Sequence, residues 1–511
     1  MKLERTQNAK RNIATGLPLK LYRTLMPFIM RTALIYLLGA QYLGLSSLFT
    51  SILEVLNLAE LGVGSAMVYS MYKPIVEDDD VTICALMNLY KKYYRIIGLV
   101  VLAAGLVLLP FVPSLIHGDV PEDINVRVLY LMYLGTTVLS YWLFAYKNSL
   151  LQAFQRVDVT NRIGLGFDTL KYALQLGVLF FLHNYYYYVL VLLAIQVLVN
   201  LFTAWRVDKL FPQYKASGDL DGEERQRVNQ RVRDLFTAKV GAVVVNSSDT
   251  IVISAFLGLT MLAIYQNYFY VLSAIIGIMV VFYQSVTAGI GNSLIVESSE
   301  KNYRDLKTLT YLIFWLSTFV TSSLIVLYQP FMLLWVGKDL MVDMSVVVCL
   351  CVYFFVFEMH GVLLTYKDAA GIWHQDRWRP LATALTNLIL NLLTVQHWGL
   401  YGIILSTVVS TTVVGMPWLL RNLFTTLFPK DLLHDYLKRL LVYAALALLV
   451  TGLNFVACMA IHLSPWPDFF VKLGISLVLP NLLLWALTSR SEGYRSAASL
   501  VGRMTNGKIK L

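Results

Sequence analysis

The sequence predicts an all-α polytopic membrane protein with about 14 transmembrane helices, and three observations lead to this fold class. Hydrophobic residues make up 58% of the 511 residues and charged residues only 14%, whereas soluble proteins carry about 25% charged residues. Apolar stretches of about twenty residues, the length of one membrane span, recur along the chain. Lys and Arg gather in alternate loops, as they do in membrane proteins. This balance excludes a string of soluble domains.

The hydrophobic stretches predict where each helix lies. The expected helices are 17–38, 44–68, 93–115, 128–147, 162–182, 187–205, 238–257, 262–289, 308–328, 344–366, 380–397, 399–419, 440–462 and 469–488. Because this number is even, both termini lie on one side. The face that holds them, including the adjoining helix ends, carries 36 of the 41 Lys and Arg residues, and the opposite face carries three. The positive-inside rule therefore places both termini in the cytoplasm. Orientation in a membrane explains the net charge of +10 without a nucleic acid partner.

The segment 239–292 reads as a transmembrane hairpin, because two apolar runs flank Leu257-Gly258-Leu259. Asp249 lies within the first run, with Asn246 one turn before it and Lys239 at its start. A carboxylate at bilayer depth costs roughly 2.5 kcal/mol or more, so Asp249 must avoid lipid. It either lines an aqueous cavity or pairs with a neighbouring helix.

The first two helices add further ionisable residues at membrane depth. Arg31 lies about 21 Å from the cytoplasmic end at 1.5 Å per residue. Its guanidinium therefore needs an anion, either a substrate phosphate or a carboxylate of a neighbouring helix. Glu54 and Glu60 share a polar half of the second helix with Ser and Asn residues. They line a cavity or neutralise Arg31.

Later helices carry polar residues for which packing is an equally open explanation. Asp168 and Lys171, three residues apart, predict either a salt bridge or cavity-facing charges. Glu358 is a candidate for ion coupling or charge balance. Asn387 and Asn391 lie on one stripe, which suits either substrate contact or helix packing. The sequence contains no nucleophile–base–acid set, P-loop, dinucleotide turn or metal-ligand spacing, so neither an enzyme nor a cofactor or metal site is expected.

Similar features recur in the two halves at an offset of 218–219 residues. Leu38-Gly39 ends the first helix as Leu257-Gly258 ends the seventh, and Asp158 precedes the fifth helix as Asp376 precedes the eleventh. Six helices per repeat predict two six-helix lobes in a parallel pseudo-twofold repeat, plus two C-terminal helices. The expected parts are an N-terminal lobe at 1–205, a basic cytoplasmic linker at 206–237, a C-terminal lobe at 238–419, and helices 13–14 with a cytoplasmic tail at 420–511. The linker ends in a basic amphipathic helix, which either binds anionic membrane lipids or only anchors the orientation.

Several stretches resemble the polysaccharide-transporter (Wzx-type) flippases of the multidrug/oligosaccharidyl-lipid/polysaccharide (MOP) superfamily. They are LLGAQYLGLSSLFTSIL at 37–53, LAELGVGSAM at 58–67, YKP at 72–74, NSSDTIVIS at 246–254 and AAGIWHQDR at 369–377. The resemblance spans nearly the whole chain. It implies a flippase of the bacterial cytoplasmic membrane that translocates undecaprenyl-diphosphate-linked oligosaccharide by alternating access, for capsule, O-antigen or exopolysaccharide biosynthesis. Polymerase and glycosyltransferase partners are implied with it.

The resemblance also implies roles for the intramembrane residues. Arg31, Lys171 and Lys239 are the cations that could serve the diphosphate, and Asn246, Asn387 and Asn391 are further candidates for binding the substrate. Asp249, Glu54, Glu60, Asp168 and Glu358 balance charge or couple Na⁺ or H⁺. Two alternatives stay open: a cation-coupled small-molecule antiporter on the same scaffold, and a membrane enzyme such as a sugar polymerase. The absence of a sizeable outward loop argues against the enzyme.

Overall fold

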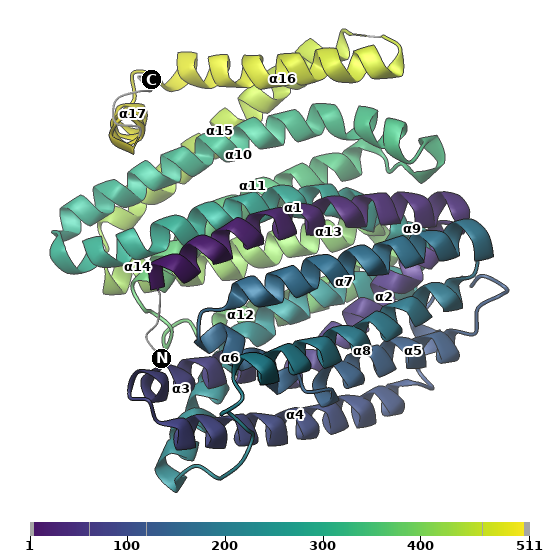
Figure 1. Ribbon diagram of the computed structural model, residues 1–511. Helices are drawn as coiled ribbons and strands as arrows, with labels where there is room; N and C mark the ends of the chain where they lie inside the picture. The colour runs from purple at the N-terminus through teal and green to yellow at the C-terminus, as the bar shows by residue number, and fades with distance from the viewer. Residues whose placement is uncertain (1–4, 61, 119, 462, 505–511) are drawn as a thin grey trace. The chain divides into compact units, whose positions relative to one another are not determined.

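The computed structural model describes residues 5–504 apart from 61, 119 and 462. At some helical positions, Lys239 and Asn246 among them, it describes the backbone alone. Throughout the described residues the regular elements are helices, as predicted (Figure 1). The chain divides into two compact units, Met1–Ala263 and Ile264–Leu511.

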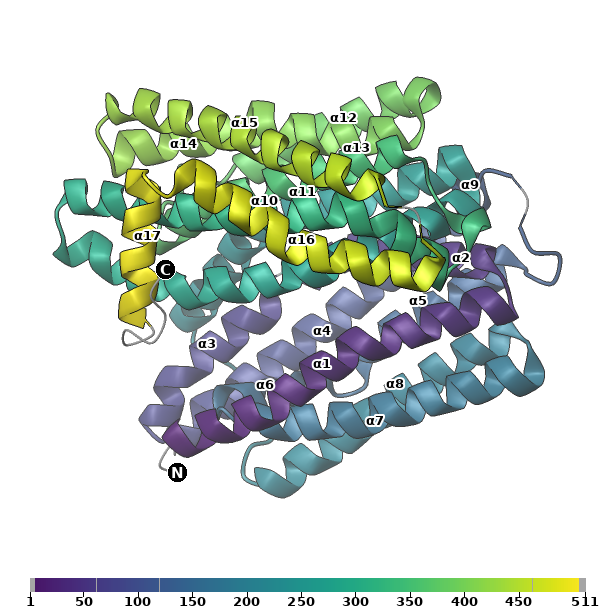
Figure 2. The ribbon, with the colours of Figure 1, turned by 90° about the horizontal axis from the view of Figure 1, so that it is seen from above.

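Unit 1 consists of antiparallel helices that pack along their lengths. Its main helices are α1 (Arg5–Leu37), α2 (Ala40–Leu56), α3 (Val63–Val76), α4 (Asp80–Leu108), α5 (Val126–Trp142), α6 (Asn148–Ala153), α7 (Val157–Gly177) and α8 (Tyr185–Leu210), followed by the first part of α9 (Gly222–Val296). Short segments join them: η1 (Asn57–Glu60), η2 (Val112–Leu115), η3 (Ala145–Lys147) and η4 (Val178–Leu182). Helix α7 lies between α1 and α8, and α5 lies between α4 and α8. Figure 2 shows α1, α7 and α8 side by side.

Unit 2 is built around α10, which packs against α11, α15 and α16. Its helices after α9 are α10 (Ser299–Trp335), α11 (Met344–Ala369), α12 (Arg379–Trp398), α13 (Leu400–Ser410), α14 (Met416–Thr426), α15 (Leu432–Met459), α16 (Pro465–Thr488) and α17 (Glu492–Met504), with η5 (Lys338–Leu340) and η6 (Thr411–Gly415) between them. Helix α17 runs across the direction of α10 and α16 (Figure 2).

Capping residues fix several helix starts. The Asp79 carboxylate accepts a hydrogen bond from the Thr82 amide at 3.0 Å at the start of α4, which also explains the acidic run 78–80 as a turn and cap. Asn125 caps α5 and Asn184 caps α8 in the same way. Ser298 caps α10. These side chains satisfy backbone donors that a helix leaves unpaired at its first turn.

Two predicted helices are interrupted where their sequences look continuous. The range 44–68 was expected as one helix, but α2 ends at Leu56, a 3₁₀ turn follows, and Gly62 adopts φ +90° before α3 begins. The range 128–147 is broken after Trp142, where Phe144 adopts φ +58°. Glycine adopts a positive φ without steric cost, whereas this conformation is uncommon for a residue such as phenylalanine.

The predicted glycine breaks at Gly39 and Gly258 are both present, with similar backbone conformations. Gly39 separates α1 from α2 at φ +123° and ψ 161°, and Gly258 interrupts α9 at φ +87° and ψ 173°. Gly118 and Gly337, also 219 residues apart, adopt φ +78° and +81°. Residue Leu259, directly after the break in α9, contacts α2 so closely that only glycine fits opposite it, at Gly44. A Cβ atom at Gly44 would meet the Leu259 carbonyl oxygen at 2.3 Å.

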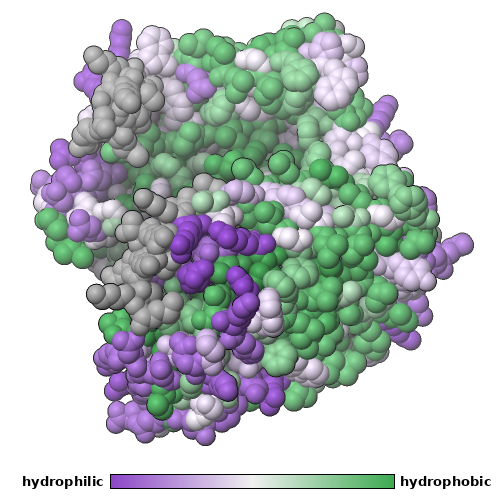
Figure 3. Space-filling model, in the orientation of Figure 1, coloured by the Kyte–Doolittle hydropathy of each residue, from purple (hydrophilic) through white to green (hydrophobic). Residues whose placement is uncertain are grey.

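Among the described residues, eight helices are long and apolar enough to span a membrane, or nine if the bent pair Val126–Trp142 and Ala145–Ala153 is one span. Four other predicted spans are helical, but they are too polar or too interrupted to meet this criterion of length and hydropathy: 17–38, 44–68, 93–115 and 380–397. Helix α9 counts as one span, although Gly258 divides it. Exposed hydrophobic residues cover α7 and α8, as Figure 3 shows. The chain is an all-helical multi-span membrane protein. A count of fourteen spans stays a prediction.

Candidate functional site

Two polar stretches predicted from the sequence, on α2 and α9, contact each other within unit 1. The Ser247 hydroxyl donates to Glu54 Oε2 at 3.3 Å, and Ser247 is fully buried while Glu54 is exposed. Asp249, on the same helix as Ser247, retains only 8% of its surface. Asp249 therefore lies inside the protein, which both of its predicted roles require, because a lipid-facing carboxylate is costly.

Glu60 is bound by tyrosines from two neighbouring helices. Its carboxylate accepts hydrogen bonds from Tyr94 of α4 at 2.7 Å and from Tyr141 of α5 at 2.9 Å. Tyr90 in turn donates to the Tyr94 hydroxyl at 2.6 Å. These two neutral hydroxyls donate to the two carboxylate oxygens of Glu60. A carboxylate held by neutral donors keeps its own charge available for a proton or a small cation.

A second charged group joins α1 to α7. Asp168 accepts from Arg23 Nε at 2.7 Å and from Lys171 Nζ at 3.1 Å, so the predicted Asp168–Lys171 pair is present with a third member. The Asp168 and Lys171 side chains are 17% and 18% exposed, and that of Arg23 is 54% exposed. Lys171 also lies 4.3 Å from the centroid of the Tyr172 ring. Two cations share one carboxylate, which leaves the group with one net positive charge.

The remaining predicted cations lie elsewhere. Arg31 is half-buried on α1 and interacts electrostatically with Tyr188 of α8. The side chains of Lys239 and Asn246 lie outside the described residues, so their predicted contacts with substrate stay predictions. Tyr185, in the same tyrosine run as Tyr188, is fully buried and shares a 2.9 Å hydrogen bond with Tyr133. Part of this run therefore faces the interior of unit 1.

In unit 2, Glu358 is fully buried on α11. Its Oε2 atom accepts a hydrogen bond from Tyr283 of α9 at 2.9 Å, and the same hydroxyl lies 2.8 Å from the Glu358 carbonyl oxygen. The Oε1 atom has no hydrogen-bond partner among the described residues, and nor does Nε2 of His360. A buried carboxylate with one unpaired oxygen is expensive in its charged form, so it favours a proton or a bound cation.

Asn387 and Asn391 of α12 are both fully buried. The Asn387 amide donates to the Thr407 hydroxyl of α13 at 2.8 Å, and the Asn391 amide donates to Asn387 Oδ1 at 3.3 Å. This row of hydrogen bonds joins α12 to α13, as expected for polar residues at a helix interface. The two asparagines therefore contribute to packing within unit 2 in this state of the protein.

The partners of the candidate residues could not be identified from the sequence. Arg23 was not among the candidates, although it lies on the same helix as Arg31. Tyr94, Tyr141 and Tyr283 gave no local signal, because they lie 34 to 81 residues from their carboxylate partners. Among the described residues, no group of three or more His, Cys, Asp and Glu side chains is placed to hold a metal ion.

No protein-family model matches the chain, and no curated protein sequence matches it. Solved structures do share its fold. One described as the lipid II flippase MurJ in an inward closed conformation is 14% identical with a TM-score of 0.68, over 93% of this chain and 98% of that one. An inward-facing multidrug resistance MATE family transporter of the MOP superfamily is 13% identical with a TM-score of 0.60, over 78% and 93% of the two chains. The MATE transporter VcmN from Vibrio cholerae is 14% identical with a TM-score of 0.54, over 82% and 96%. At these identities the likeness shows the fold alone, which is MurJ/MATE-like.

Proposed function

We propose that this chain is a flippase that moves undecaprenyl-diphosphate-linked oligosaccharide repeat units across the bacterial cytoplasmic membrane. The observation that carries the proposal is the surplus positive charge of the Arg23–Asp168–Lys171 group. One carboxylate shared between two cations leaves a donor set for a phosphate, because both arginine and lysine bind phosphate oxygens.

Such a protein must lower the free-energy cost of moving the polar headgroup through the hydrocarbon core of the membrane. A diphosphate and several sugars cannot cross unaided, because their polar groups would lose water without replacement. Arg31 and Lys239 are further candidate contacts for the phosphates, and Asn246, Asn387 and Asn391 for the sugars. The fold shared with the structure described as a lipid II flippase supports a lipid-linked substrate.

The proposed architecture has fourteen spans with both termini in the cytoplasm. Two six-helix lobes, 1–205 and 238–419, alternate access to the two sides, and helices 13–14 form an appendage. The repeated glycine breaks at Gly39 and Gly258, with matching φ and ψ, support the two-lobe repeat. Polymerase and glycosyltransferase enzymes would be its partners in polysaccharide biosynthesis, and we expect neither enzymatic activity nor a cofactor.

The carboxylates at membrane depth suit ion coupling. Glu60 and Glu358 are bound by tyrosine hydroxyls, and Glu54 is exposed beside Ser247. Together with Asp249 they are candidates for binding H⁺ or Na⁺ during the transport cycle, since binding of either ion offsets the cost of a carboxylate charge at membrane depth.

Complementation tests the proposal. Cells that lack the protein should accumulate the lipid-linked oligosaccharide and lose surface polymer, and the wild-type chain should restore both. Lys171→Gln and Arg31→Ala should reduce surface polymer strongly while the protein remains in the membrane. Lys73→Gln is the control, because the Lys73 side chain is 82% exposed and pairs with Glu77, the residue that follows the end of α3.

Asp168→Asn separates a phosphate site from a structural salt bridge. A phosphate site would keep or gain transport when Asp168 loses its charge, because the two cations remain. A purely structural ion pair would make Asp168→Asn as damaging as Lys171→Gln. Equal loss in the two variants, or normal polymer in both Lys171→Gln and Arg31→Ala, would refute the proposed site.

A cation-coupled small-molecule antiporter is the second candidate. The shared fold of MATE transporters and the tyrosine-bound carboxylate of Glu60 favour it. Drug resistance conferred by the chain, with unchanged surface polymer in its absence, would identify this function.

A further inference from the structure

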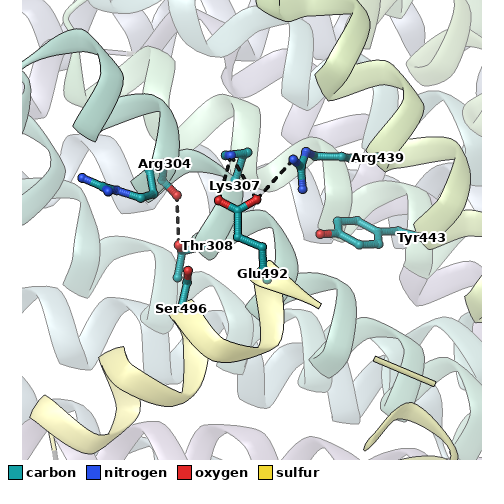
Figure 4. A pocket seen from close by; sticks show the side chains of 8 residues that line it. Arg304, Lys307, Thr308, Arg439, Tyr443, Glu492 and Ser496 are labelled. Atoms are coloured by element: carbon teal, nitrogen blue, oxygen red, sulfur yellow. Dashed lines mark hydrogen bonds and ion pairs between the residues drawn. The ribbon is translucent and has the colours of Figure 1, made fainter. Parts of the chain in front are cut away.

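A basic pocket in unit 2 lies where α17 crosses α10 and α15. Its lining residues are Arg304, Lys307, Thr308, Arg439, Tyr443, Glu492, Gly493 and Ser496. Figure 4 shows Glu492, the first residue of α17, between the side chains of Lys307 and Arg439. None of the candidate transport residues described above lines this pocket.

Glu492 neutralises these cations only loosely. Its carboxylate lies 3.3 Å from Lys307 Nζ and 3.4 Å from Arg439 Nη2, whereas charge-assisted hydrogen bonds are usually about 2.7–2.9 Å long. The Lys307 side chain is 17% exposed and the Glu492 side chain is 56% exposed. Lys307 is thus largely covered while its counterion Glu492 is half in solvent, where an ion pair adds little stability. Arg439 has a second and closer carboxylate, Asp435, at 2.9 Å.

The pocket also holds donors other than the two cations. Arg304 lines it, although its guanidinium points away from Glu492 in Figure 4. The Ser496 and Tyr443 hydroxyls line the same space. Helix α17 also begins at this pocket, and the backbone N–H groups of its first turn favour an anion.

Helix α17 does not depend on Glu492 for its position. A Cβ atom at Gly493 would lie 2.7 Å from the Tyr311 ring, so α17 approaches α10 as closely as glycine allows. Ala497 is buried, and the Tyr494 ring lies 6.0 Å from that of Trp315. The Glu492 side chain can therefore turn toward solvent while α17 remains docked.

Exposed apolar residues lie close in sequence to the pocket residues and favour a lipid as the source of the anion. On α15, Leu441 and Val442 lie between the pocket residues Arg439 and Tyr443 in sequence and are 72% and 55% exposed. On α16, Trp485 and Leu487 precede Glu492 by seven and five residues and are 54% and 46% exposed. A phosphate carried by a lipid would have its acyl chains beside these residues, whereas a free phosphate ion would gain nothing from them.

We propose that the pocket formed by Lys307, Arg439 and α17 binds the phosphate of an anionic phospholipid, and that Glu492 occupies this place when the lipid is absent. The lipid headgroup and the Glu492 carboxylate then compete for the same two cations. The site binds a lipid of the leaflet on the side of α17, and it is separate from the path of the transported substrate.

Native mass spectrometry of the purified full chain tests this proposal, with phosphatidylglycerol and phosphatidylcholine of the same acyl chains. The wild-type protein should retain phosphatidylglycerol several-fold more than phosphatidylcholine. Lys307→Gln should remove this preference. Glu492→Gln should increase retention of phosphatidylglycerol, because the internal competitor has lost its charge. Lys301→Gln is the matched control on α10, since Lys301 pairs with Glu297 and Asp305 outside the pocket.

Each other outcome counts against the proposal. Equal retention of the two lipids by the wild-type protein, or lower retention of phosphatidylglycerol by Glu492→Gln, would refute it. Displacement of phosphatidylglycerol by inorganic phosphate at equal concentration would show a phosphate ion site and overturn the lipid assignment. Arg439→Gln is a weaker test because Arg439 also binds Asp435 at 2.9 Å. Thermal melting of each variant verifies that it is folded.

Discussion

Arg379 and Asp376 form a two-pronged ion pair in the interior of unit 2, at the start of α12. The distances are 2.7 Å from Nε to Oδ1 and 2.9 Å from Nη2 to Oδ2. Arg379 is 6% exposed and Asp376 is 3% exposed. In unit 1, Asp158 near the start of α7 binds Arg156, with Nε 2.9 Å from Oδ1. The two aspartates that the sequence aligned at an offset of 218 therefore make the same kind of contact.

Asp376→Asn should destabilise the protein strongly. It leaves the buried guanidinium of Arg379 without its counterion, and breaking a buried ion pair costs roughly 3–5 kcal/mol. Thermal unfolding in detergent measures the effect. Asp305→Asn, on a carboxylate whose side chain is 47% exposed, should cost at most about 1 kcal/mol. Equal melting temperatures for the two variants would contradict the structural role of Asp376.

Gly44→Ala should also destabilise the protein, for a steric reason. The new methyl group would meet the Leu259 carbonyl oxygen at 2.3 Å, so α2 and α9 would have to separate. Overpacking of this kind costs roughly 1–3 kcal/mol. Gly166→Ala on α7 is the control, because a Cβ atom there meets nothing within 4 Å, and alanine favours a helix by about 1 kcal/mol over glycine. A lower melting temperature for Gly44→Ala and an unchanged or higher one for Gly166→Ala are expected.

The sequence predicted the features that depend on local pattern. Each predicted hydrophobic range contains a helix, Gly39 and Gly258 break their helices, and Lys171 pairs with Asp168. These follow from hydrophobic period, glycine conformation and i, i+3 spacing. The turn after Leu56 and the positive φ of Phe144 were not predicted, because both lie in hydrophobic stretches that read as continuous helices.

The same limit applies to the candidate site. A polar residue in an apolar helix can be located from sequence, since its cost in lipid makes it conspicuous. Its partner is set by which helices touch. Glu60 is bound by Tyr94 and Tyr141, which lie on two other helices. The residues around each of these tyrosines do not distinguish it from the other tyrosines among the 31 of the chain. The sequence therefore predicts where the charged residues lie along the helices, but not which residues surround them.

Tyr94→Phe should destabilise unit 1 more than Tyr90→Phe. Tyr94 donates directly to the Glu60 carboxylate, and Tyr90 reaches it only through Tyr94. A hydrogen bond to a charged group contributes roughly 1.5–3 kcal/mol, and one between neutral groups roughly 0.5–1.5 kcal/mol. Melting temperatures of the two variants, with Glu60→Gln beside them, measure the difference. If Tyr94→Phe remained costly on a Glu60→Gln background, the hydroxyl would not act through the carboxylate charge.

Asp249→Asn should uncouple transport from the ion gradient while leaving the protein folded. The amide keeps the size of the side chain and much of its hydrogen bonding, but it carries no charge that a proton or Na⁺ could neutralise. The measurement is substrate movement in vesicles with and without an imposed Na⁺ or H⁺ gradient. Asp208→Asn is the control, because the Asp208 side chain is 57% exposed and pairs with Lys147. Asp249 lies inside unit 1, on the helix whose Ser247 binds Glu54, so a loss of gradient dependence in Asp249→Asn alone would assign coupling to α9. Gradient-dependent transport that is unchanged in Asp249→Asn would limit this carboxylate to helix packing.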